Sequence, residues 1–431
     1  MITREQAVDT AHRWINGELP QEAARAVRSH EFELGWVVWP EPSPVQVDPL
    51  TGARRAPEEI GAACAVVDRV TGELTVWPSV PVPAVVRRYR DKLGAGSYDP
   101  ALPPCTGPGV RATLVHRDAE GEPRTLVVDS AHGLPHPLLR GWQQLRQQGV
   151  QPADLVSLHA DLRPGMLPGG YWAYVLRAVL PDTPIGYDHA NGPWFDHRAE
   201  GARQVSAGRA RPGEARLNRV PFPVAVPPAQ PESAPDLAAR LAALFGPDGV
   251  RRFDPEAVLA ADLPEAVARP LREVGLPRVV EGFFTLHHPE PDGVLDGAPT
   301  APVLPELTAH LAAAGRGEGA TAAARQALLG QVLLGTDGWS LLTVDTARGR
   351  VRAIDPDHAG ARYCNADLTA FTRCLALLAD RLPRLRGLDP QTAGPAVAEF
   401  QWALATLDRT VFDDPENWWA VVVEQLWHGQ L

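Results

Sequence analysis

The spacing of hydrophobic and polar residues predicts a helix, strands and a second helix in the first quarter of the chain. Residues 3–15 place their apolar side chains on one helical face. Residues 31–40 and 62–78 have the alternation and aromatic content of strands, the second range as two strands around a turn. A short helix over 84–93 follows. A helix, a three-stranded meander and a helix predict a small α/β-meander domain over residues 1–95.

The next stretch alternates strand and helix patterns. Residues 111–130 predict a hairpin around the turn DAEGEP. A helix is expected within 132–149, a strand over 154–162, and, after a short helix, a strand, a turn and a final helix within 183–205. This order of elements is that of the cytidine-deaminase-like α/β fold, which we expect over residues 105–220.

The last part of the chain combines helices with one β region. An amphipathic helix is expected over 236–246, and strong helices over 365–382 and 414–429. Between them, turns GTDG and TARG separate three predicted strands, at 331–334, 340–345 and 350–354. This mixture predicts an α+β domain over residues 236–431.

Two breaks rich in proline or glycine separate these parts. Residues 94–104 and 221–235 interrupt the periodic pattern, and proline in the second break favours an extended, semi-rigid linker. A chain of 431 residues is also too long for one ordinary core. We therefore expect an α+β multidomain protein with three domains.

Charge argues against nucleic acid as a partner. The net charge is −11, and no long basic patch offsets it. Phosphate backbones attract basic grooves, so electrostatics disfavours nucleic-acid binding. No uncharged apolar run approaches the roughly 20 residues of a membrane span, so we also expect no membrane association.

The four cysteines are scattered, and no pair has C-x-x-C spacing. A thiolate zinc site or a redox motif is therefore not expected. Sparse cysteines suit a reducing compartment, and the first residues lack the apolar core of a signal peptide. Together these features predict a cytoplasmic protein.

The motifs HRWING, ELGWVVWP, AVVDRVTGELTVWPS and YRDKL follow one another in residues 1–95. In this order they resemble the YrhB-type domain, one of the families found among bacterial immunity proteins. The motifs are mostly core-forming, so we expect Trp14, Trp36 and Trp39 to be buried or half-buried.

Residues 160–172 read ADLRPGMLPGGYW, and RAEG follows at 198–201. This stretch resembles the strand-to-helix corner of nucleic-acid/nucleotide deaminases of polymorphic toxin systems, Ser-Glu-Leu-x-Pro-Cys-x-x-Pro-Gly-x-Tyr-Cys, without a gap. The two family cysteines fall on Gly165 and Trp172, and the glutamate falls on Asp161.

This departure removes the chemistry that the resemblance implies. Zinc deamination needs a metal that activates water and a carboxylic acid that moves protons. Glycine has no ligand atom and tryptophan offers only an N–H donor. His136 or His132 alone cannot hold zinc, because catalytic zinc sites use three protein ligands. We expect a pseudo-deaminase with no catalytic residues, in which Trp172 fills the vacated cavity.

A replacement metal site is the alternative. His132, His136, His159 and Asp161 could converge at the old pocket mouth, and Asp-His pairs recur at 188–189 and 196–197. Polar residues of loops and strand ends explain the same pattern. We favour this second interpretation and expect no metal and no cofactor.

Four blocks in order, VGLPRVVEGFF, LGTDGWSLLTVDTARGRVRAIDPD, YCNADLTAF and DDPENWWAVVVEQLW, span residues 236–431. They resemble the fourth family of the SUKH (Smi1/Knr4-like) immunity superfamily, which implies toxin neutralisation by binding. Turn and cap chemistry is the preferred explanation of each acidic residue taken singly, but their summed charge fits a face toward a basic toxin. The partner-binding candidates are Asp337, Asp345, Asp355, Asp357, Asp413, Asp414 and Glu416.

Three functions follow from these patterns, in order of preference. The first is a non-catalytic, immunity-type protein that binds a protein toxin or another protein partner. The second is a scaffold whose pseudo-deaminase senses a nucleotide without turnover. The third is an active nucleic-acid/nucleotide deaminase with attached immunity domains.

Overall fold

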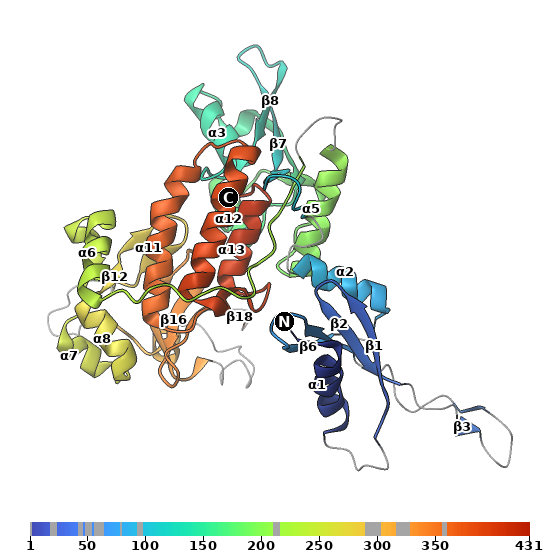
Figure 1. Ribbon diagram of the computed structural model, residues 1–431. Coiled ribbons are helices and arrows are strands. Elements are labelled where there is room, and N and C mark those ends of the chain that lie inside the picture. Colours follow the sequence, from blue (N-terminus) through green and yellow to red (C-terminus); the bar gives the residue numbers. More distant parts are fainter. Residues whose placement is uncertain are drawn as a thin grey trace. The chain divides into compact units, whose positions relative to one another are not determined.

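The computed structural model divides the chain into two compact units, residues 1–97 and 98–431 (Figure 1). The structure describes residues 2–17, 24–41, 46–47, 54–55, 64–77, 80–92, 98–209, 216–288, 303–315, 328–355 and 360–431. Both units mix helices with separate sheets, which confirms the expected α+β class.

The first unit is a four-stranded antiparallel sheet between two helices. Its elements are α1 (Arg4–Asn16), β1 (Val27–Phe32), β2 (Gly35–Pro40), β5 (Cys64–Asp68), β6 (Leu74–Trp77) and α2 (Val82–Lys92), with a separate pair β3 (Gln46–Val47) and β4 (Arg54–Arg55). The strand order is β1-β2-β5-β6. The expectation of a three-stranded meander is wrong, because the range 31–40 contains a turn between β1 and β2. Most side chains of β1 are not buried, so its sequence carries little strand signal.

Alternation along β2 explains why a helix covers each face of this sheet. Trp36 and Val38 pack with Ala7 and Ala11 of α1, whereas Val37 packs with residues of α2. Trp36 is fully buried, while Trp14 and Trp39 are half-buried, as expected from the motif.

The second unit begins with a four-stranded sheet. Its elements are β7 (Arg111–Arg117), β8 (Pro123–Asp129), α3 (Pro137–Gln147), β9 (Leu155–Leu162), α4 (Trp172–Val179), β10 (Ile185–His189) and α5 (Phe195–Arg209). The strand order is β10-β9-β7-β8, with β10 parallel to β9 and the other pairs antiparallel. The predicted hairpin and the order of helices and strands are confirmed.

The rest of this unit is a six-stranded antiparallel meander with helices around it. The strands are β13 (Val279–Val280), β14 (Phe284–Leu286), β15 (Gln331–Thr336), β16 (Leu341–Asp345), β17 (Val351–Asp355) and β18 (Gly360–Asn365). A separate pair is β11 (Val250–Arg251) and β12 (Leu276–Pro277). The helices are α6 (Ala234–Phe245), α7 (Pro255–Ala260), α8 (Glu265–Glu273), α9 (Leu307–Ala313), α11 (Leu368–Leu385), α12 (Pro390–Leu407) and α13 (Trp418–Trp427). No described helix is long and apolar enough to cross a membrane.

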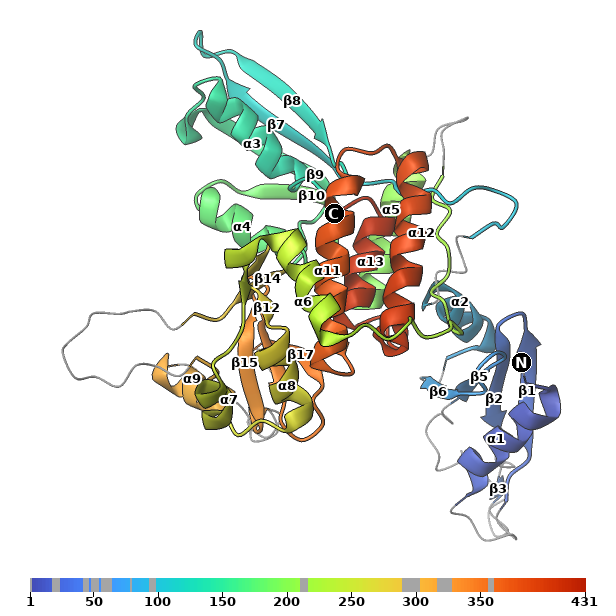
Figure 2. The ribbon, with the colours of Figure 1, turned by 60° about the vertical axis from the view of Figure 1, so that its left-hand side comes forward.

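Helix α13 lies at the centre of the second unit, and its ten residues are all buried. Figures 1 and 2 show it beside α12 and α11. Each of its indoles donates a hydrogen bond inside the core: Trp418 to Asp337, Trp419 to Asn365 and Trp427 to Gln401. A helix that is apolar on all sides must be covered on all sides. The segment that covers the remaining side of α13 is the one that contains the corner 160–172.

Candidate functional site

The corner 160–172 joins the end of β9 to the start of α4. The amide of Ala173 donates to the carbonyl of Gly165 over 3.2 Å, which closes the loop between them. Tyr171 caps α4 in the left-handed conformation, with φ 46° and ψ 48°. This conformation is costly for a residue with a Cβ, so tertiary contacts must hold it. The Tyr171 hydroxyl supplies such a contact, because it donates to Asp337 over 2.6 Å.

The two positions that align with the family's cysteines lie near each other and near His136. The rings of His136 and Trp172 lie 6.2 Å apart, and Gly165 is tied to the residue after Trp172. The Trp172 indole packs, half-buried, against the core of the four-stranded sheet. Its ring lies beside that of His136. None of the described residues accepts a hydrogen bond from its Nε1.

The side chains at these positions do not fit a zinc ion. His136 caps α3, and its Nδ1 accepts from the amide of Leu138 over 3.2 Å. Burial lowers the pKa of His136 to about 3, so the ring is neutral. Gly165 and Trp172 add no ligand atom. Within the described ranges, no group of three or more His, Cys, Asp or Glu residues could hold a metal ion.

Asp161 stands where the family has its glutamate. Its Oδ1 accepts from the amide of Arg111 over 2.9 Å, and its Oδ2 forms an ion pair with Arg209. Oδ1 therefore links β9 to β7, and Oδ2 ties α5 to the sheet.

The other histidines serve different contacts. His132 is buried; its Nδ1 donates to the carbonyl of Leu431 over 2.9 Å, and its Nε2 lies 2.8 Å from the hydroxyl of Thr106. His159 pairs with Asp188 on the neighbouring strand over 3.2 Å. These contacts fit the interpretation of polar residues at loops and strand ends.

The segment that contains the corner and α13 meet at a buried ion pair between Arg198 of α5 and Glu424 of α13. Nε of Arg198 donates to Oε1 of Glu424 over 3.0 Å, and Nη2 donates to Oε2 over 3.0 Å. Both side chains are 2% exposed. Burial alone would raise the pKa of Glu424, but the charge and hydrogen bonds of Arg198 outweigh it and lower that pKa.

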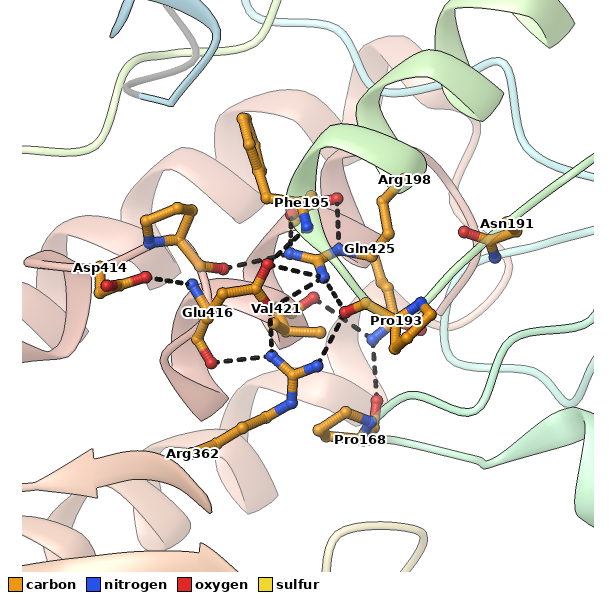
Figure 3. Close-up of polar contacts among 12 residues, drawn as sticks. Pro168, Asn191, Pro193, Phe195, Arg198, Arg362, Asp414, Glu416, Val421 and Gln425 are labelled. Atoms are coloured by element: carbon orange, nitrogen blue, oxygen red, sulfur yellow. Dashed lines mark hydrogen bonds and ion pairs between the residues drawn. The ribbon is translucent and has the colours of Figure 1, made fainter. Parts of the chain in front are cut away.

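A second ion pair, between Arg362 and Glu416, lies next to Arg198 (Figure 3). Nη1 of Arg362 donates to Glu416 over 2.5 Å, and its Nη2 donates to the carbonyl of Pro193 over 2.9 Å. Glu416 also accepts from the amide of Phe195 and from Arg198. The start of α5 is thus bound to Glu416, which lies just before the first residue of α13.

Asp337 fixes the corner itself to the six-stranded sheet. Besides Tyr171, it accepts from Nε1 of Trp418 over 2.9 Å and from the amide of Ser340 over 2.7 Å. Burial raises its pKa, although these donors oppose that shift. Asp337 was expected on an acidic face; that expectation is wrong for this residue, because it is 4% exposed.

The remaining acidic candidates lie in different turns and at the ends of different elements. Asp345 accepts from the amides of Ala347 and Arg348 in a turn. Asp355 accepts from Nε1 of Trp339, and Asp414 accepts from the amide of Glu416. Asp413 is exposed, and Asp357 lies outside the described residues.

Sequence reasoning did not single out the residues that join the two segments. Arg198 was quoted only as part of the RAEG motif. Glu424 is an acid within the apolar run WWAVVVEQLW, and a charge in such a run signals a buried partner. The partner itself is 226 residues away in sequence, so no local pattern could identify it.

Family models match three segments of the chain in the order that the motifs indicated. Residues 5–97 match the Immunity protein 35-like domain, residues 107–207 a Xanthomonas-like deaminase, and residues 237–425 the SUKH-4 immunity protein. No curated protein and no solved structure matches significantly. The chain therefore carries immunity-protein domains at both ends and a deaminase-like domain between them.

Proposed function

We propose that this chain, with two immunity-type domains around a deaminase-like one, neutralises a protein toxin by binding it and without catalysis. The observation that carries the proposal is the chemistry of the corner. Positions 136, 165 and 172 converge as a metal site would, yet they carry a neutral imidazole, a glycine and an indole. The deaminase-like domain keeps the shape of a catalyst without the ligands that its reaction needs.

The contacts of the corner support a structural role in place of catalysis. Tyr171 and Arg198 bind Asp337 and Glu424 of the SUKH-type segment. Gln425 of α13 donates to the carbonyl of Pro168 in the corner over 2.8 Å. The deaminase-like domain thus completes the burial of α13, and the two segments present one rigid surface to a partner. Rigid surfaces lose less entropy on binding.

Electrostatics favour a basic partner. The chain carries a net charge of −11, and complementary charge accelerates encounter with an oppositely charged protein. A toxin that acts on nucleic acid needs a basic surface of its own, so an acidic immunity protein suits it.

The test is rescue of growth. Toxin domains of polymorphic toxin systems, including those encoded beside this gene, are expressed singly in a sensitive bacterium with and without the full chain. We expect rescue from at least one toxin, and equal rescue by His136→Asn, because asparagine keeps the cap of α3 but removes the imidazole nearest to the positions of the family's cysteines.

Failure to rescue from every toxin, including those encoded beside the gene, would contradict immunity. Loss of rescue with His136→Asn, in a variant that folds as the wild type does, would contradict a non-catalytic mechanism. Release of ammonia from cytidine or adenosine would support the deaminase alternative, and stabilisation by a nucleotide would support the sensing scaffold.

A further inference from the structure

Two large aromatic side chains of the deaminase-like segment are exposed where it meets the SUKH-type segment. Trp194, just before α5, is 60% exposed and Tyr174 of α4 is 50% exposed. Tyr174 also packs edge-to-face on Trp339, with ring centroids 5.3 Å apart. Trp339 belongs to the turn between β15 and β16, so both segments contribute to this aromatic surface.

Hydrogen bonds link the residues beside both exposed rings to β17 and β18. On one side, Trp339 beside Tyr174 donates to Asp355, the last residue of β17. Asp355 pairs with Gly360, the first residue of β18. On the other side, Arg362 of β18 donates to the carbonyl of Pro193, the residue before Trp194.

Acidic residues complete this surface. The carboxylate of Glu416 accepts from the amide of Phe195, the residue after Trp194, and Asp414 in turn accepts from the amide of Glu416. Asp413 and Asp414 are both exposed. We name the whole patch the seam surface, and its members are Tyr174, Trp194, Trp339, Asp355, Asp413 and Asp414.

We propose that the seam surface is the docking site for an arginine-bearing basic segment of the protein toxin. Guanidinium groups stack on the faces of tryptophan and tyrosine and pair with carboxylates, and the seam surface offers both groups together. Exposed tryptophan and tyrosine are also the residues that dominate binding energy in protein interfaces. This inference rests on the proposed function and adds a site and a partner chemistry to it.

Two arginines near the seam surface, Arg198 and Arg362, are paired with glutamates. Arg198 and Arg362 lie beneath it, but Glu424 and Glu416 pair with them. They therefore do not repel an incoming guanidinium as unpaired cations would. The same ion pairs fix the loop that carries Trp194, so binding requires little ordering of the backbone.

The test uses a labelled peptide of alternating glycine and arginine, with glycine–glutamate and glycine–serine peptides for comparison. Binding to the full chain is followed by fluorescence anisotropy. We expect the arginine peptide alone to bind, and Trp194→Ala combined with Tyr174→Ala to weaken its binding about tenfold.

Trp402→Ala is the matched control, because Trp402 is a tryptophan of α12 with 50% exposure away from the seam surface. We expect it to change binding by less than about twofold. Each variant should unfold within about 2 °C of the wild type, which separates lost binding from lost folding.

Three results would overturn the inference: no binding of the arginine peptide, equal binding of the serine or glutamate peptide, or equal weakening by Trp402→Ala. The growth-rescue test is independent of these results. If rescue fails while the peptide binds at the seam surface, the immunity function falls and a cation-binding surface remains. If rescue succeeds while the peptide result is negative, the toxin docks elsewhere.

Discussion

Replacing Arg198 with methionine tests whether the deaminase-like domain is an integral part of the SUKH-type core. The wild-type guanidinium makes two bonds of 3.0 Å to Glu424 and further bonds to the carbonyls of Pro193 and Pro415. Without it, the Glu424 carboxylate remains 2% exposed with its main counter-charge removed. Breaking one partner of such a buried pair costs about 3–5 kcal/mol.

Hydrogen exchange of the α13 amides measures this loss locally, in the full chain. A loss of about 3 kcal/mol corresponds to roughly a hundredfold faster exchange, if these amides exchange by opening of the interface. The double variant Arg198→Met with Glu424→Leu should recover most of the protection, because neither member of the pair is then left as a buried charge without its partner.

Two results would refute this reasoning. One is an exchange rate within about threefold of wild type in Arg198→Met, which would mean that the pair carries little stability. The other is a double variant no better protected than the single one, because the uncompensated Glu424 charge would then not be the cause.

Three further predictions concern the corner and the seam surface. His136→Asn should reduce the loss of stability in acid. The pKa of His136 falls from 6.5 to about 3 on folding, so its contribution to wild-type stability is full above pH 6.5 and declines below it, by up to about 1.4 kcal/mol per pH unit. Urea unfolding at about pH 7 and pH 5 measures the difference, and an unchanged dependence of the unfolding free energy on pH would contradict it. Gly165→Cys with Trp172→Cys should create a zinc site with His136, visible as cobalt charge-transfer absorption that neither single variant shows, although a Cβ at position 165 must displace Asn191 and Leu167, now 3.1 Å away, by a few tenths of an ångström. No absorption from the folded double variant would mean that these positions do not form a metal-binding geometry. Trp194→Ala with Tyr174→Ala should also weaken rescue from the toxin, whereas Trp402→Ala should not.

Local patterns predicted the elements that depend on neighbouring residues. The helix predicted within residues 3–15 forms and begins with a capping box between Thr3 and Gln6, with bonds of 2.9 and 3.3 Å. The hairpin of β7 and β8 follows from its own alternation. These elements carry their signal within a few residues, so tertiary context did not override it.

Elements shaped by distant contacts were missed. Helix α12 contains Gly394 and Pro395, which interrupt the helical pattern. A Cβ at Gly394 would lie 2.2 Å from the carbonyl oxygen of Pro104, so the approach of another segment requires glycine there. The helix expected over 365–382 begins at Leu368 with Asp367 as its cap, and Asn365 instead ends β18 as a buried acceptor for Trp419.

The candidate site shows the same division. The alignment of the corner was readable from residues 160–172, because that motif is contiguous. The burial of Asp337 was not, because it depends on Tyr171 and Trp418, which lie 166 and 81 residues away in the chain. An aspartate in a GTDG turn has the local sequence of an exposed residue. Asp337 is buried only because the segments that carry Tyr171 and Trp418 pack over it.

The central claim is that the deaminase-like corner has a structural role, completing the burial of α13, and is not a catalyst. The most direct test measures zinc content and base conversion on one sample of the purified full chain, with single-stranded DNA and free nucleosides as substrates. The account predicts far less than one zinc per chain and no conversion of cytosine or adenine. One zinc per chain, with deamination that stops on chelation and returns when zinc is restored, would contradict it.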